Sequence, residues 1–143
     1  MDQKIQFFFE GTNFDLKKKK EIRIWVNKLI RAELKIPHRI NFIFCDDAYL
    51  IHLNRIYLLR DYYTDVISFD FAKSRQIVSG DIYISMDRIK ENAKKFRQPI
   101  DNELLRIMFH GVLHLAGYKD SNLKDKSKMR EKEDHYLLKF HES

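Results

Sequence analysis

The sequence is poor in the residues that characterise secreted, fibrous or disordered proteins. It has one cysteine, four glycines and two prolines in 143 residues. A single cysteine excludes an internal disulfide and fits a reducing cytoplasm, and so few glycines and prolines argue against long linkers. No apolar run approaches the roughly 20 residues of a membrane span, and the N-terminus lacks the layout of a secretory signal. We therefore expect one cytoplasmic domain over residues 1–143, with no membrane association.

The charge is moderately positive. Lysine and arginine number 27 against 21 aspartates and glutamates, giving a net charge of +6 and a pI of about 9.3. Such a balance favours a polyanionic partner. The densest basic run, Lys17 to Lys20, is interpreted as the solvated first turns of a helix, and Cys45 as a small buried hydrophobic residue.

The periodicity of the apolar residues predicts four strands and five helices in the order β-α-β-α-β-β-α-α-α. The predicted strands cover about 4–9, 40–45, 66–71 and 76–85, and the predicted helices about 14–34, 46–58, 86–97, 101–116 and 122–140. We expect an α+β fold in which a single mixed sheet of about four strands is covered by about five helices, mainly on one side.

Several local signals refine this prediction. The second strand is apolar at successive positions, which places it in the middle of the sheet, and the last two strands are close enough to form a hairpin. Pro37 is expected to close the first helix, and Asp46 to cap the second. Asp101 is expected to cap the fourth helix, with Ile100 and Leu105 as a hydrophobic staple.

The most informative segment runs from His110 to Asp120 and reads HGVLHLAGYKD. His110 and His114 are four residues apart, so both imidazoles lie on one face of a helix and can reach one metal ion. Gly117 can end this helix in a left-handed conformation, and the chain could then bring Asp120 toward the same ion. Two imidazoles and one carboxylate leave a position for water, which is the open geometry of catalytic zinc.

Two other interpretations of this segment need to be weighed. The histidines could be ordinary core residues, but two imidazoles on a very apolar helix need polar partners. A zinc peptidase of the H-E-x-x-H type is disfavoured because Gly111 occupies the position of its general base. A glycine inside a helix also costs about 1 kcal/mol relative to alanine, which suggests a close approach to the backbone at Gly111.

The chain resembles the YbeY family of bacterial zinc-dependent endoribonucleases, which act in ribosomal RNA maturation. The family pattern H-G-x-L-H-L-x-G-Y-D-H, followed by M-x-x-x-E, is met by residues 110–118 and by the spacing from Asp120 to Met129 and Glu133. Upstream, Leu53-Asn54, the segment TDVISF at 64–69 and GDI at 80–82 are similar to further family motifs.

The chain departs from the family pattern at two positions. The third metal-binding histidine of the family falls on Asp120, a competent zinc ligand whose negative charge should make the metal a weaker Lewis acid. A family arginine falls on Leu58, and Arg60 could supply that cation from a shifted position. A surface salt bridge of Arg60 with Asp61 or Asp65 is the alternative.

The resemblance implies one zinc ion per chain, held by His110, His114 and Asp120, with Glu133 orienting a histidine from outside the ligand set. It implies a single-strand-specific endoribonuclease that processes the 3′ end of 16S ribosomal RNA, with ribosomal RNA and the small ribosomal subunit as partners. Tyr62 and Tyr63 could stack on bases, although loop packing is the more ordinary interpretation. A non-enzymatic ribosome-assembly factor with a structural zinc, and a zinc hydrolase of another bond, remain as alternatives.

Overall fold

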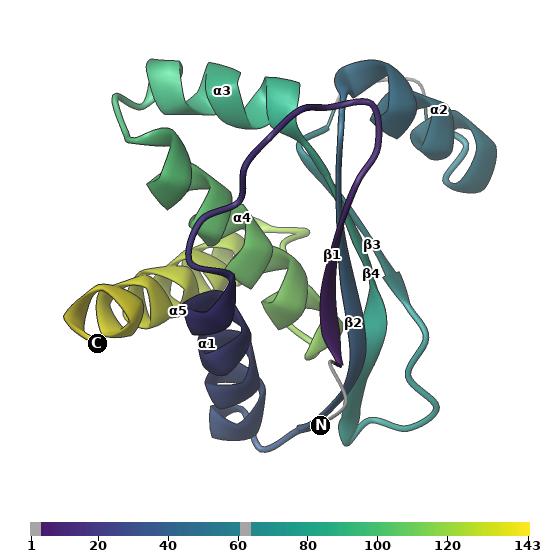
Figure 1. Ribbon diagram of the computed structural model, residues 1–143. Helices are drawn as coiled ribbons and strands as arrows, with labels where there is room; N and C mark the ends of the chain where they lie inside the picture. Colours follow the sequence, from purple (N-terminus) through teal and green to yellow (C-terminus); the bar gives the residue numbers. More distant parts are fainter. Residues whose placement is uncertain (1–3, 61–63) are drawn as a thin grey trace.

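A mixed four-stranded sheet lies at the centre of the computed structural model, which describes residues 4–60 and 64–143 (Figure 1). The strand order is β1-β2-β4-β3, where β1 is Ile5–Phe9, β2 is Ile36–Cys45, β3 is Val66–Asp70 and β4 is Ile77–Ser85. β2 pairs in parallel with β1 and with β4, and β3 pairs antiparallel with β4. The α+β class, the central position of β2 and the β3–β4 hairpin are therefore confirmed.

Helices cover the two faces of the sheet unequally (Figure 1). They are α1 (Lys19–Ala32), α2 (Asp47–Tyr57), α3 (Met86–Lys95), α4 (Ile100–Leu115) and α5 (Leu123–Glu142). The main core joins one face of the sheet to α1, α3, α4 and α5, whereas α2 packs on the other face. There Leu50 contacts Ile67 and Cys45, and Cys45 is fully buried, as predicted. No helix in the described ranges has the length and apolarity needed to cross a bilayer.

The central helix α4 is fixed by its packing against β4. Most of its side chains are buried and apolar, so burial stabilises it on nearly every side. A Cβ atom on Gly111 would lie 2.7 Å from Cγ2 of Ile82, which confirms the predicted close approach at this glycine. Gly117 ends the helix with φ +112°, and the amide of Tyr118 donates to the carbonyl of Leu113 at 3.0 Å. The helix end at Gly117 is therefore confirmed, and the turn after it leads to Asp120 and then to α5.

Three local predictions were tested at helix ends. Asp46 caps α2 as predicted, because its side chain accepts from the amide of Tyr49 at 2.8 Å. The predicted role of Pro37 was wrong: α1 already ends at Ala32, and Pro37 lies in β2 at a register shift, where its missing N–H is tolerated.

The predicted start of α4 was also wrong. Pro99 precedes the first helical residue with φ −60°, and no side chain caps the helix. Proline has this φ built in, so the helix begins at Ile100 and Asp101 falls inside the first turn. Ile100 consequently cannot serve as the residue before the cap in a staple with Leu105.

Candidate functional site

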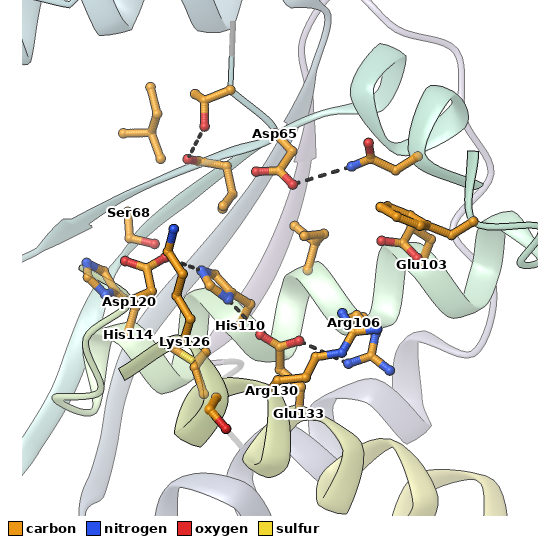
Figure 2. A pocket seen from close by; sticks show the side chains of 18 of the residues that line it. Asp65, Ser68, Glu103, Arg106, His110, His114, Asp120, Lys126, Arg130 and Glu133 are labelled. Carbon is orange, nitrogen blue, oxygen red and sulfur yellow. Dashed lines mark hydrogen bonds and ion pairs between the residues drawn. The ribbon is translucent and has the colours of Figure 1, made fainter. Parts of the chain in front are cut away.

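A cleft of about 900 Å³ opens between α4, α5, the start of β3 and the end of α2 (Figure 2). α4 supplies the two histidines, the turn after it supplies a carboxylate, and α5 forms one wall. Every site residue predicted from the sequence lines this cleft: Arg60, His110, His114, Asp120 and Glu133.

The ring nitrogens of the two histidines have distinct roles. Nδ1 of His110 lies 2.7 Å from Oε2 of Glu133, and Nδ1 of His114 lies 3.0 Å from the carbonyl oxygen of Tyr118. A carboxylate and a carbonyl oxygen only accept hydrogen bonds, so each Nδ1 carries the proton and donates it. Nε2 of each imidazole is therefore the nitrogen left for a ligand.

The contact between His110 and Asp120 points to a positive charge. Nε2 of His110 lies 3.4 Å from Oδ2 of Asp120. Two electron pairs facing each other at this distance repel unless a proton or a metal ion lies between them. His110 and Asp120 can therefore share a proton or a metal ion, and His114 lines the same cleft (Figure 2).

Three titratable groups of the cleft, His110, Asp65 and Glu103, have pKa values shifted by their surroundings. Burial acts to lower the pKa of His110, but the hydrogen bond to Glu133 and the charges of Glu133, Asp120 and Asp65 outweigh it and raise that pKa. Burial raises the pKa of Asp65 and that of Glu103, against the opposing charges of His110 and Arg106 respectively. Such a group of shifted pKa values in one cleft is typical of a functional site.

Glu133 is itself held in place from α4. Its Oε1 accepts from Nη1 of Arg106 at 3.0 Å, and Nη2 of Arg106 donates to Asp134 at 2.8 Å. Glu133 is only 5% exposed, and its buried negative charge is compensated by the neighbouring Arg106 and His110. The arginine fixes the carboxylate, and the carboxylate fixes the imidazole of His110.

The sequence reasoning missed Glu103 and Arg106, although a signal for both was present. Glu103, Arg106, His110 and His114 follow one another at intervals of three, four and four residues. These intervals put them in one stripe along a helix that is otherwise apolar. A helical projection of α4 could have found the whole stripe, whereas the two-histidine motif found only its C-terminal half.

A second network supports His114 from the far side of the turn. Glu33, at the end of α1, accepts hydrogen bonds from the hydroxyl of Tyr118 at 2.5 Å, from Lys132 at 3.2 Å and from the hydroxyl of Tyr136. Burial acts to raise the pKa of Glu33, but these donors outweigh it and lower that pKa. The network fixes Tyr118, whose carbonyl oxygen holds His114. No sequence signal links Glu33 to a residue 85 positions away.

The remaining predicted residues are also placed. Arg60 is exposed at the cleft, and Leu58 also lines the cleft.

Met129 is buried in the core, and the four histidines outside the motif are exposed: His38, His52, His135 and His141. Asp61, Tyr62 and Tyr63 lie outside the described residues, so the salt bridge to Asp61 and the proposed base stacking remain predictions.

The side chains present are suitable ligands for a metal ion, although they are not arranged as a complete coordination site. Among residues 4–60 and 64–143, no three His, Cys, Asp or Glu side chains are arranged as a ready metal-binding group. Nε2 of His110 and Oδ2 of Asp120 nevertheless lie 3.4 Å apart, and His114, whose Nδ1 is bound to the Tyr118 carbonyl, lines the same cleft. Two imidazoles and a carboxylate are ligands that zinc commonly takes.

Fold and cleft together define an α+β domain with a histidine–carboxylate site, and comparisons with known proteins give its family. The family model described as Endoribonuclease YbeY matches residues 8–141. Endoribonuclease YbeY of Flavobacterium psychrophilum is 47% identical over 137 residues, 96% of both chains. That of Cytophaga hutchinsonii is 44% identical over 133 residues, 93% of both chains.

A solved structure has the same fold. The solution structure of TM1509 from Thermotoga maritima superposes with a TM-score of 0.67 at 28% identity, covering 95% of this chain and 88% of that one. The chain therefore belongs to the YbeY endoribonuclease family, and the resemblance found in the sequence is confirmed.

Proposed function

We propose that this protein is a metal-dependent endoribonuclease that cuts single-stranded RNA during ribosomal RNA maturation. The observation that carries the proposal is the pair of imidazoles whose Nδ1 atoms are held by Glu133 and by the Tyr118 carbonyl, with Asp120 facing Nε2 of His110. Relatives that match this chain nearly end to end are named endoribonucleases. The processing step would be that of the 3′ end of 16S ribosomal RNA, on the small ribosomal subunit in the cytoplasm.

His110, His114 and Asp120 are the residues that would hold the metal, which we take to be one zinc ion per chain. When bound, such an ion supplies Lewis-acid chemistry to a phosphodiester. The protein contributes orientation: Glu133 and the carbonyl of Tyr118 fix the imidazole planes and keep both protons on Nδ1. Arg106 and the Glu33 network hold these two acceptors in turn.

Other residues of the cleft would serve the substrate. Arg60 is exposed at the cleft and offers a guanidinium to a phosphate, in a chain whose Leu58 lacks the cation of the family pattern. Asp65 is partly buried in the same cleft, and this burial raises the pKa of its carboxyl group. A flexible single strand can bring its backbone and splayed bases into such a cleft more easily than a stacked duplex can.

RNA cleavage by matched histidine variants tests this proposal. A labelled single-stranded RNA would be incubated with wild type, His114→Ala and His52→Ala, all purified in parallel. His52 is exposed on α2 and does not line the cleft, so its variant should cut like wild type. His114→Ala should lose cleavage while RNA binding is largely kept.

Two outcomes would contradict the proposal. Equal cleavage by wild type and His114→Ala would indicate a contaminating nuclease. Absence of cleavage by wild type with zinc bound would favour the non-enzymatic assembly factor.

A further inference from the structure

One face of α5 is turned toward the cleft. Leu123, Lys126, Ser127 and Arg130 all line it, at intervals of three, one and three residues. These positions follow each other along a single helical stripe, so the side chains share one wall of the cleft. Figure 2 shows Lys126 close to the histidines and Arg130 further along, near Glu133 and Arg106.

The two cations of this stripe make few contacts within the fold. Lys126 is exposed, and no ion pair joins it to another described residue. The one ion pair of Arg130 with a described residue is to Asp134 at 3.9 Å, and 65% of its side chain is exposed; its charge also acts to lower the pKa of Glu103. Arg106 shows the contrast, because it is 13% exposed and binds two carboxylates at 3.0 and 2.8 Å. An exposed pair at 3.9 Å contributes little to stability, so ion pairing in the folded protein accounts for little of either cation.

Two of the carboxylates in the cleft lie deeper than the two cations. Those of Glu103 and Glu133 are buried, whereas Lys126 and Arg130 are exposed. Asp120 is exposed as well, but it is the carboxylate that the proposed metal ion would neutralise, so an RNA backbone along α5 would meet the two cations before the buried carboxylates. Residues four apart on a helix are separated by about 6 Å along its axis, which is comparable to the spacing of neighbouring backbone phosphates.

We propose that Lys126 and Arg130 form a phosphate-binding track on α5, which holds the RNA backbone beside the group that is cut. The proposal rests on the endoribonuclease function and adds a substrate contact to it. Leu58 stands where the family pattern has a cation, and the α5 track adds two cations to the lining of the same cleft. Leu123, which is 86% exposed next to the track, adds an apolar surface for a base.

The salt dependence of RNA binding tests the track. Binding of a fluorescent single-stranded 2′-O-methyl RNA would be measured at several salt concentrations, with a gel to show that it stays intact. Each phosphate contact to a single strand contributes about 0.7 to the slope of log K against log salt. The double variant Lys126→Ala/Arg130→Ala should therefore lose about 1.4 of that slope and bind about 10-fold more weakly at low salt.

The matched control is Lys124→Ala/Lys128→Ala. It removes the same charge from the same helix at exposed positions that do not line the cleft. The control should have the same salt slope as wild type. The variant Lys126→Arg/Arg130→Lys should also have the wild-type slope, because it keeps both positive charges. In cleavage of ordinary RNA the track variant should raise KM and leave kcat nearly unchanged.

Equal slopes for the track variant and the control, with both folded by circular dichroism, would overturn the track. A wild type that shows no salt-dependent RNA binding would instead defeat the endoribonuclease function, so the two failures are distinguishable.

Discussion

The substitution Glu133→Gln examines how the protein orients its metal-binding histidine. Glu133 accepts from Nδ1 of His110 at 2.7 Å and from Nη1 of Arg106 at 3.0 Å. A glutamine keeps the shape but has only one oxygen for these two donors. If its oxygen stays with Arg106, its amide faces His110 and forces the proton onto Nε2. That tautomer cannot offer Nε2 to a metal.

Two magnitudes follow from this geometry. Hydrogen bonds to charged groups contribute about 1.5–3 kcal/mol each, and one of two is lost, so the free energy of unfolding should fall by about 1.5–3 kcal/mol. Loss of a group that orients a ligand commonly lowers metal affinity by about 10- to 100-fold. That range equals about 1.4–2.8 kcal/mol of binding free energy. In the metal-free variant the pKa of His110 should also fall, because Glu133 raises it.

The assay combines a competitive zinc titration, urea unfolding and NMR titration of the imidazoles. The control is Asp134→Asn, which makes the same carboxylate-to-amide change on the neighbouring residue. Asp134 also contacts Arg106, at 2.8 Å, but is exposed and has no contact with His110 among the described residues. Asp134→Asn should therefore leave zinc affinity and the pKa of His110 close to those of wild type.

The reasoning would be refuted if Glu133→Gln bound zinc as tightly as wild type. It would also be refuted if the two variants weakened zinc binding equally, since the effect would then come from Arg106 and not from the orientation of His110.

Three further predictions concern single positions. Gly111→Ala should lower the free energy of unfolding by up to about 2 kcal/mol. The new methyl group would lie 2.7 Å from Ile82, and the cost of this overpacking exceeds the gain in helix propensity from alanine. A higher urea midpoint for the variant than for wild type would contradict this prediction. Cys45 is fully buried, and burial raises the pKa of its thiol to about 12. A thiol reagent at pH 8 should therefore label Cys45 only in denaturant. Stoichiometric labelling of the native protein would contradict this prediction. Asp120→Ala should lower zinc affinity 10-fold or more while Asp120→His retains the metal, and equal affinity for alanine and wild type would mean that another group completes the site.

The sequence predicted those parts of the fold that depend on local periodicity. β2 has apolar residues at successive positions because it is buried on both faces, and the β3–β4 hairpin follows from a short polar connection. The ends of α1 and α4 were less predictable. Pro37 sits at a strand irregularity and Pro99 sets the start of a helix, and both depend on the backbone conformation of neighbouring residues.

The residues of the site likewise divide into those that could be predicted from the sequence and those that could not. His110, His114 and Glu133 could be found because they share short spacings or a family motif. Glu33 could not, since it reaches the turn at Tyr118 only when α1 packs beside α5. The sequence predicts a helix over about 122–140 but no cationic stripe on it, because only the position of the cleft separates Lys126 and Arg130 from the neighbouring lysines.

The central claim is that a metal held by His110, His114 and Asp120 is needed to cut RNA, and a zinc titration of cleavage tests it most directly. Protein stripped with a chelator would receive increasing zinc, and cleavage of a single-stranded RNA would be followed for wild type and His114→Ala. The account predicts no cleavage without metal, a rise in wild-type activity to a plateau near one zinc per chain, and no recovery in His114→Ala. Full cleavage by the stripped wild type, or the same recovery in both proteins, would contradict it.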